Sequence, residues 1–503
     1  MTKKFDAVVI GAGLGGMSAA AMLAKNGKSV MLLERHNVPG GYATSFRRGR
    51  FEFDISLHEL SGVGGPEARG ALYPYLESLG VTEKVDFIPM DQLYRVIDGD
   101  MDLTVPAGRD ESHEYFTENF PKEAEGIERF FDSMQDLMGD YGGVIAGAST
   151  GADDLSPEKF PNFIKHGMKT YGEVLDDFIT DQNLKNALSP YWGYGGLPPS
   201  KLPFHLMASI WEAYLNAPPA HIRGTCQALS NAFVEIVLEN GGEVVFNCGA
   251  KKILTSGDKI TGVVTDDDRE ITTSVIVSNA NPLSTMIDLV GLENTPKKFM
   301  RDINSRIVGF STFNVYLGLD CPPEEVGTMV HENFIDMGGD IEAIWERGFT
   351  LDPPEGVLFT NYNATDPQFS PPGTTVVVLL SVCYARPWYY IPPDQYVQTK
   401  NAYAEALLNV SEKHFPGFRD HIEVIEVSTP VTNMRYTGNP GGTIYGFDQY
   451  LSDSGMLRLR HKGPIDGLFF ASAWTIPGGG YQPSIMAGSI AGGRALARLA
   501  KGA

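Results

Sequence analysis

The stretch FDAVVIGAGLGGMSAAAMLAKNGKSVMLLERHNVPGGYATS, Phe5 to Ser45, decides the fold of this chain. Its apolar runs and glycines predict a strand over Phe5–Ile10, a helix over Leu14–Asn26 and a second strand over Ser29–Leu33. Two strands joined by a helix in this way lie parallel in one sheet, with the helix packed on its face. The sequence therefore predicts an α/β fold that begins with a parallel sheet.

A glycine turn joins the first strand to the helix and fits the pattern G-x-G-x-x-G over residues 11–16. Gly11 permits the tight turn, Gly13 lets the backbone approach a pyrophosphate, and Gly16 lets helix and strand pack closely. The free N–H groups at the start of the helix favour an anion. The hexapeptide alone is a weak signal, and a glycine-rich turn without a ligand is the alternative. The flanking strands and the helix favour nucleotide binding.

The second strand ends at an acid, Glu34, which is suited to accept hydrogen bonds from a ribose diol. A 2′-phosphate at that place would meet a like charge, so the expected ligand is FAD or NAD rather than a 2′-phosphorylated dinucleotide. The segment Arg35–Thr44 follows directly and contains Gly40-Gly41. This glycine pair lets the chain pass close to the phosphates and the ribityl chain of a bound cofactor.

At these residues the sequence resembles the FAD-dependent amine oxidase and phytoene desaturase superfamily, in which an acid, a short spacer and Gly-Gly follow the second strand. Gly49–Asp54 resembles the G-x-x-F-D segment of desaturase relatives. Tyr191–Pro203 and Thr432–Gly446 resemble the carotenoid isomerase and retinol saturase branch. Gly467–Gly480 is similar to the C-terminal flavin signature of the family. The resemblance implies a Rossmann-type FAD-binding domain assembled from discontinuous segments, with an inserted mixed α+β substrate domain.

The resemblance also implies which residues hold FAD. Covalent attachment is not expected, because the C-terminal signature contains no cysteine. Ala250 is expected to touch the adenine through its backbone, with an ordinary strand start as the alternative. The predicted cofactor-binding residues are Gly11, Gly13, Leu14, Gly15, Gly16, Glu34, Arg35, Gly40, Gly41, Tyr42, Ala43, Thr44, Ala250, Ala473, Gly479, Gly480 and Ser484.

A helix predicted over residues 484–499 is expected to point its N-terminus at the flavin ring, where the helix dipole stabilises negative charge on the reduced ring. Packing of small residues is the alternative reading of this helix. Two positions depart from family patterns. Ala473 stands where many relatives carry an acid that binds the ribityl chain, although carotenoid desaturases often have a small residue there. Tyr42 stands where many amine oxidases have a basic residue, which weakens an amine oxidase assignment.

Three side chains are candidates for catalysis. His58 follows the Phe53–Leu57 segment and is placed to act as a proton donor beside the flavin, with a structural, hydrogen-bonded histidine as the alternative. Its neighbour Glu59 is a weaker candidate. Tyr481 follows the glycine loop and is expected to line the substrate site, with a core aromatic residue as the alternative.

The motifs divide the chain into two predicted domains. Residues 1–65, 220–290 and 427–503 form the FAD-binding domain, and residues 66–219 and 291–426 form the substrate-binding domain. The inserted segments are rich in aromatic residues, methionine and proline, which suits an apolar tunnel, although cores have the same composition. Gly467–Gly493 carries no charge, but its glycines and prolines predict a strand, a loop and a helix rather than a membrane span.

Composition excludes several classes of function. The 503 residues include 40 Lys plus Arg and 62 Asp plus Glu, a net charge of −22, so nucleic acid is not an expected partner. The four cysteines form no Cys-x-x-Cys pair, and no Cys/His cluster has metal-ligand spacing, so no metal is expected. No signal peptide precedes the first strand, which predicts a cytoplasmic protein.

The expected activity is FAD-dependent hydride transfer at C=C or C–C bonds of a lipophilic polyene or isoprenoid, such as a carotenoid or retinoid. Saturation, desaturation and isomerisation stay open. A second dinucleotide motif is missing, so a diffusible quinone or reductant is expected to exchange the electrons unless the reaction is redox-neutral. Peripheral membrane contact is expected from the lipophilic substrate. The alternatives are a flavin amine oxidase and a non-catalytic FAD- or lipid-binding protein.

Overall fold

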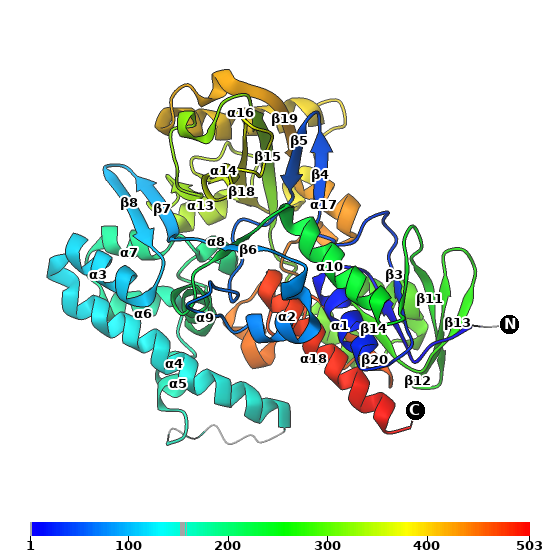
Figure 1. Ribbon diagram of the computed structural model, residues 1–503. Helices are drawn as coiled ribbons and strands as arrows, with labels where there is room; N and C mark the ends of the chain where they lie inside the picture. Colours follow the sequence, from blue (N-terminus) through cyan, green and yellow to red (C-terminus); the bar gives the residue numbers. More distant parts are fainter. Residues whose placement is uncertain (1–2, 151–155, 157, 503) are drawn as a thin grey trace.

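The structure, a computed structural model, describes residues 3–150, 156 and 158–502. A five-stranded parallel sheet lies at the lower right in Figure 1. Strands from both ends and from the middle of the chain meet in this sheet. Their order is β10 (Glu243–Val245), β3 (Val30–Leu33), β2 (Ala7–Ile10), β14 (Ile276–Ser278) and β20 (Leu468–Phe470). All pairs are parallel, which confirms the predicted α/β fold with a discontinuous nucleotide-binding sheet.

The two faces of this sheet are covered differently. Ala7 and Val9 of β2 face a core shared with three helices, α1 (Leu14–Lys25), α10 (Thr225–Glu239) and α18 (Tyr481–Ala500). Val8 and Ile10 face a second core beneath a small sheet. That sheet consists of β1 (Lys3–Lys4), β13 (Glu270–Thr272), β12 (Lys259–Thr265) and β11 (Ala250–Ser256). The alternation along one buried strand therefore produces a three-layer arrangement.

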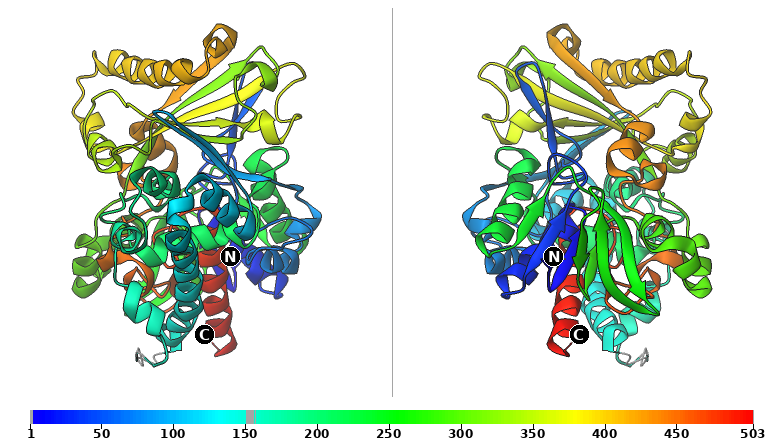
Figure 2. Two further views of the ribbon diagram at one scale, coloured as in Figure 1. Left: turned by 90° about the vertical axis from the view of Figure 1, so that its left-hand side faces the viewer. Right: turned by 90° about the vertical axis from the view of Figure 1, so that its right-hand side faces the viewer.

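A seven-stranded sheet forms the upper part of the molecule in Figures 1 and 2. It is antiparallel except where β16 and β7 pair parallel. Its order is β19 (Ile422–Ser428), β15 (Ser311–Leu319), β18 (Thr375–Cys383), β17 (Val357–Asn361), β16 (Glu332–Ile335), β7 (Gln92–Asp98) and β8 (Met101–Pro106). The helix α16 (Tyr396–His414) packs on one face through Leu407.

A helical layer flanks the large sheet and shares one core with β7 and β16. It contains α3 (Arg109–Asn119), α4 (Ala124–Thr150), α5 (Pro161–His166), α6 (Tyr171–Phe178), α7 (Gln182–Leu188), α8 (Trp192–Gly195) and α9 (Phe204–Leu215). Figure 1 shows these helices at the lower left, on the opposite side from β1–β3. The aromatic residues of the predicted insertion therefore build a core of their own.

Several elements were not predicted. The first inserted segment, residues 66–219, contains helices and also supplies β6 (Phe87–Pro89), β7 and β8, none of which was predicted from the sequence. The hairpin of β4 (Ser45–Arg48) and β5 (Phe51–Asp54) lies in the first predicted FAD-binding segment, but its Phe51 and Phe53 pack against the large sheet. The proposed division into two domains stays a prediction.

The uncharged Gly467–Gly493 stretch forms the strand β20, a loop and the start of α18, as the sequence predicts. Among the described residues, no helix is both long and apolar enough to cross a membrane.

Candidate functional site

A cavity of about 880 Å³ runs along the carboxyl edge of the parallel sheet. Binding pockets for small molecules and cofactors usually measure about 300–1,000 Å³. The cavity brings together residues that lie more than 450 positions apart in the sequence. The predicted site residues that line it are Gly11, Gly13, Leu14, Gly15, Glu34, Arg35, Gly40, Gly41, Tyr42, Ala43, His58, Glu59, Ala250, Ala473, Gly479, Gly480, Tyr481 and Ser484.

Two predicted cofactor residues lie beside the cavity rather than on its wall. A Cβ atom at Gly16 would lie 2.0 Å from the carbonyl oxygen of Gly11, so this glycine serves the close packing of helix on strand. The hydroxyl of Thr44 donates a hydrogen bond of 2.5 Å to Gln227 on α10. Both residues support the cavity wall through packing or hydrogen bonding without lining the cavity.

The glycine turn presents the N-terminus of α1 to the cavity. Gly11 has a φ of +91°, a conformation that residues with a side chain rarely adopt. Gly15 needs space instead, because a Cβ atom there would lie 2.0 Å from the carbonyl oxygen of Ala471. The first N–H groups of a helix have no partner within the helix. The turn can therefore offer backbone donors to an anion in the cavity.

Glu34 directly follows β3 and is fixed by backbone donors. Its Oε2 accepts a hydrogen bond of 2.7 Å from the N–H of Ala12, and its Oε1 accepts one of 2.7 Å from the N–H of His36. The carboxylate retains lone pairs for a further donor such as a ribose hydroxyl. Its orientation is thus set before any ligand arrives.

Sequence reasoning missed Asn279, which follows β14 directly and lines the same cavity. Its Oδ1 accepts a hydrogen bond of 3.2 Å from the N–H of Gly16. A polar residue at the carboxyl end of a parallel strand is a known sign of a ligand site, so this residue could have been found from the predicted strand.

The Gly-Gly segment lies against the first glycine turn. The N–H of Gly40 donates a hydrogen bond of 2.7 Å to the carbonyl of Ala12. The side chain of Tyr42 reaches the Thr432–Gly446 segment, where its hydroxyl donates to the carbonyl of Gly442 at 2.7 Å. Arg35 donates to the carbonyl of Tyr436 at 3.2 Å. These contacts join the start of the chain to the Thr432–Gly446 segment.

The C-terminal loop brings a second helix N-terminus to the cavity. Gly479 and Gly480 line the cavity and precede α18, whose first turn contains no acidic residue. Tyr481 and Ser484 in that turn also line it. The hydroxyl of Tyr481 donates to the carbonyl of Tyr42 at 3.0 Å. This hydrogen bond favours a structural role for the tyrosine hydroxyl. The start of α18 supplies a positive dipole end near any ring bound there.

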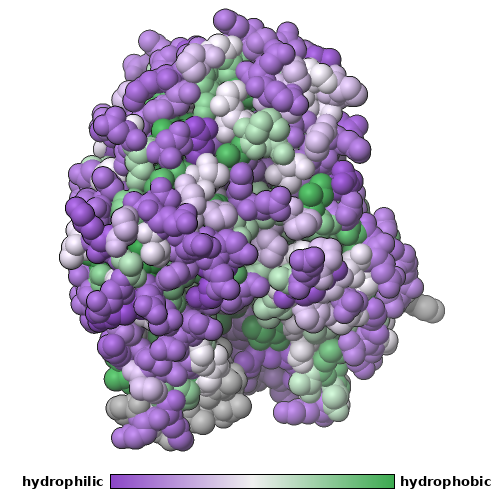
Figure 3. All heavy atoms as spheres, turned by 60° about the vertical axis from the view of Figure 1, so that its left-hand side comes forward, coloured by the Kyte–Doolittle hydropathy of each residue, from purple (hydrophilic) through white to green (hydrophobic). Residues whose placement is uncertain are grey.

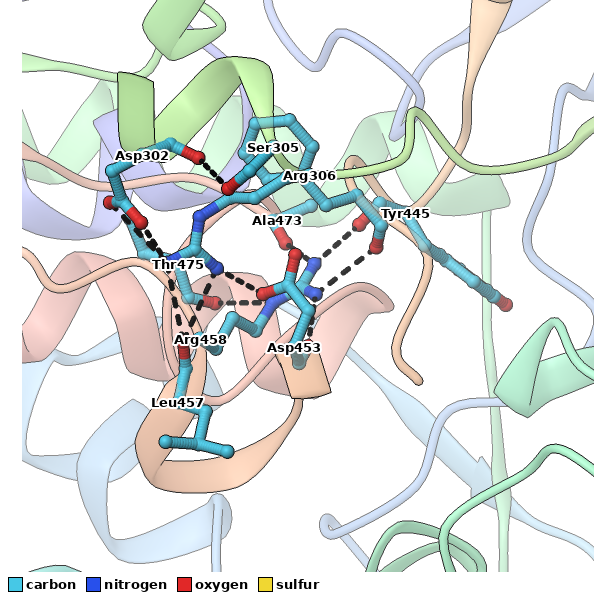
Figure 4. Close-up of polar contacts among 10 residues, drawn as sticks. Asp302, Ser305, Arg306, Tyr445, Asp453, Leu457, Arg458, Ala473 and Thr475 are labelled. Carbon is cyan, nitrogen blue, oxygen red and sulfur yellow. Dashed lines mark hydrogen bonds and ion pairs between the residues drawn. The ribbon is translucent and has the colours of Figure 1, made fainter. Parts of the chain in front are cut away.

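A buried arginine holds the C-terminal loop from behind (Figure 4). Arg458 is 1% exposed, and its guanidinium donates to the carbonyls of Ala473 at 2.7 Å and Tyr445 at 2.9 Å. It also donates to Phe447 at 3.1 Å and to Thr475 at 3.2 Å. Burial lowers the pKa of Arg458 to about 10, so it stays charged at neutral pH. Ala473 is thus positioned by hydrogen bonds to its backbone.

A group of buried ionisable residues borders the apolar part of the cavity. His58 lines the cavity, and its Nδ1 lies 2.6 Å from the hydroxyl of Thr360. Glu59 is 7% exposed, and neither carboxyl oxygen has a hydrogen-bond partner. Burial raises the pKa of Glu59 well above its usual range, and the nearby Glu332 raises it further. Both effects favour the protonated form of Glu59, which is the form that can give up a proton.

Aliphatic and aromatic side chains line the remainder of the cavity. They are Leu57, Leu60, Leu206, Ile210, Ala213, Tyr214, Ile444, Tyr445, Trp474, Met486 and Ile490. Several come from α9 and α18. Figure 3 shows a recess in the lower part of one face, with hydrophobic atoms on its floor. The site thus combines a polar nucleotide end with an apolar chamber.

Comparison with known proteins gives matches over nearly the whole chain. The family model described as "Flavin containing amine oxidoreductase" matches residues 14–499. All-trans-retinol 13,14-reductase of Rattus norvegicus is 24% identical over 513 residues, which cover 93% of this chain and 82% of the rat protein. Prolycopene isomerase 1, chloroplastic, of an Oncidium hybrid cultivar is 24% identical over 514 residues, covering 99% and 84%.

Among solved structures, an oxidoreductase from Methanosarcina mazei matches with a TM-score of 0.65 and 17% sequence identity. The match covers 97% of this chain and 99% of that one, and it shows a shared fold.

Proposed function

The chain belongs to the flavin containing amine oxidoreductase family and is a flavin-dependent oxidoreductase; from this premise we propose that it binds FAD non-covalently and acts on carbon–carbon bonds of a lipophilic polyene. The polyene is of the carotenoid or retinoid kind, and the reaction is saturation, isomerisation or desaturation. The observation that carries this proposal is a buried carboxyl group without a hydrogen-bond partner, that of Glu59, at the apolar end of a dinucleotide-sized cavity.

The residues at the polar end fit FAD. The helix N-terminus behind Gly13 suits a pyrophosphate, and the oriented carboxylate of Glu34 suits a ribose diol. A side chain at Gly15 would clash with the backbone of Ala471, so the glycine turn can lie this close to the C-terminal loop only with glycine at this position. No cysteine is among the described residues that line the cavity, which supports non-covalent binding.

A bound flavin supplies hydride transfer to or from carbon. The chain's own residues then orient the substrate, exclude water and move a proton. The buried carboxyl group of Glu59 at the cavity wall would hold the proton, because its surroundings favour the protonated form. General acid catalysis by a positioned side chain contributes about 10²- to 10⁴-fold to a rate. Protonation of a polyene carbon is a step for which such an acid is suited.

Two relatives support a polyene substrate through their names. The rat protein is named as a retinol reductase, and the Oncidium protein is named as a prolycopene isomerase. The apolar chamber lined by Leu206, Ile210 and Met486 can receive a long hydrocarbon. Electron exchange with a diffusible quinone or reductant and peripheral contact with a membrane are parts of the same proposal.

The test uses the purified holoprotein under anaerobic conditions. The flavin is reduced, retinoids and carotenoids are added, and flavin absorbance and product mass are followed together. Reoxidation with a gain of two hydrogens indicates saturation, and a changed isomer with the flavin still reduced indicates isomerisation. Bleaching of the oxidised enzyme by a polyene indicates desaturation.

The same measurement with monoamines and polyamines tests the rival amine oxidase. Bleaching by an amine, with no response to any polyene, would overturn the proposal. No response to either class would leave a flavin-binding protein without this chemistry.

A further inference from the structure

Two buried carboxyl groups lie close to His58, and they differ in their partners. Glu59 faces the cavity without any hydrogen bond. Glu332, on β16, is fully buried and accepts from the hydroxyls of Thr360 at 2.8 Å and Tyr194 at 3.1 Å. Its Oε1 also lies 3.6 Å from Nδ1 of His58. Two hydroxyls thus donate to Glu332 with good geometry, and donors of this kind stabilise a carboxylate.

The hydroxyl of Thr360 gives the hydrogen-bond chain a direction. A hydroxyl has one proton, and Thr360 donates its proton in the hydrogen bond to Oε2 of Glu332. Its oxygen must then accept from Nδ1 of His58, which lies 2.6 Å away. Nδ1 therefore carries the proton in neutral His58, and Nε2 is left with a lone pair. Since His58 lines the cavity, Nε2 is the nitrogen available to a substrate.

The surroundings of Glu59 favour its protonated form. Two carboxylates in one low-dielectric region cannot both ionise without a large cost. Tyrosine hydroxyls are the other titratable groups that face Glu59, and burial raises the pKa of each of them, so all stay neutral. They are Tyr94 on β7, Tyr191 and Tyr194 at α8, and Tyr214 on α9.

We propose that Glu332, acting through Thr360, is a positioning residue that makes His58 the proton acceptor and Glu59 the proton donor of the site. The inference rests on the proposed function for what reacts in the cavity. In an isomerisation, Glu59 gives one proton to carbon and Nε2 of His58 removes one from carbon, and proton exchange with solvent returns both residues to their starting states. In a saturation, Glu59 would supply the proton that accompanies the hydride that a bound reduced flavin would provide, and solvent would restore the proton to Glu59.

The first experiment follows the carboxylic acid band of Glu59 by infrared spectroscopy across pH, on the holoprotein and without substrate. The variant Glu59→Gln assigns the band by removing it. Wild type is expected to keep the band at and above neutral pH. In Glu332→Gln, the midpoint pH, at which half of the Glu59 carboxylic acid band is lost, is expected to fall by at least about one unit, a tenfold change in the proton affinity of Glu59. Flavin absorbance checks that each variant is folded.

The second experiment tests the hydrogen-bond chain by turnover. Thr360→Val keeps the shape but removes the hydroxyl, and we expect kcat to fall at least about tenfold with KM little changed. Thr360→Ser keeps the hydroxyl and is expected to stay near wild type. The pH profile of kcat should change in Thr360→Val and stay as in wild type in Thr360→Ser.

An ionised Glu59 at neutral pH in wild type would overturn the proposal, as would an unchanged midpoint in Glu332→Gln. If Glu332→Gln does not hold flavin, the comparison of Thr360→Val with Thr360→Ser decides, and equal kcat values would overturn it. A failed search for a polyene substrate leaves the infrared result intact, so the two proposals fail separately.

Discussion

Replacing Arg458 with methionine should weaken the fold and the flavin site together. Methionine has a similar length but no donor, so four backbone carbonyls within 3.2 Å of the guanidinium lose their partner. Two of these carbonyls, those of Ala473 and Thr475, belong to the loop that leads into α18. The loop is then expected to move, and the flavin to bind more weakly.

The magnitude follows from two opposing contributions. Hydrogen bonds to a charged group contribute about 1.5–3 kcal/mol each, so four contribute about 6–12 kcal/mol. Burying the charged guanidinium costs several kcal/mol, and methionine removes that cost. The expected loss in the free energy of unfolding is about 4 kcal/mol. Arg458→Lys keeps the charge but has only three donors on a single nitrogen, and it should recover about half of the loss.

Urea unfolding, followed by far-ultraviolet circular dichroism, measures this loss, and flavin absorbance after gel filtration measures retention of the cofactor. Arg460→Met is the matched control, because Arg460 is exposed two residues away and should change stability by at most about 0.5 kcal/mol. An Arg458→Met protein as stable as the Arg460→Met control, with full flavin content, would refute the reasoning.

Two further predictions concern stability. Burial raises the pKa of Asp54 to about 7, so the folded state binds a proton that the unfolded state releases near pH 4, and wild-type stability falls as pH rises between these values. Asp54→Asn should therefore gain about 3 kcal/mol relative to wild type between pH 5 and pH 8, and a constant difference in urea titrations would contradict this. Gly488→Ala should cost about 1–3 kcal/mol, because its Cβ would lie 2.2 Å from the carbonyl oxygen of Gly15. Gly493→Ala on the same helix meets no atom within 4 Å and serves as control, and equal thermal stability of the two variants would count against the packing argument.

Local sequence patterns were sufficient to predict two parts of the site, the β2–α1–β3 unit and the C-terminal loop. The β2–α1–β3 unit follows from apolar periodicity, and its glycines follow from the turn and the close contacts that they occupy. The C-terminal loop was found from its glycines and proline. These features need only neighbours within a few tens of residues, so a single sequence contains them.

Tertiary contacts build the rest, and no local pattern marks them. Thr360 and Glu332 lie on adjacent strands of a sheet whose pairing was not predicted, and they reach His58 across about 270 or more positions of sequence. Arg458 and Arg460 are alike in sequence context, and only the fold makes one buried and the other exposed. Asn279 is the exception, because its place after β14 gave a usable signal.

The order of strands in the parallel sheet has a consequence for biosynthesis. The middle strand β2 comes early in the chain, whereas β20 and α18 are synthesised several hundred residues later. Until then α1 lacks the helix that covers its small, alanine-rich face, and half of the flavin cavity does not exist. Domains usually fold from the N-terminus during synthesis, but here the nucleotide site can close only once α18 has been made. The nascent chain therefore exposes an apolar surface of α1 until that point, which makes it a natural client for chaperones.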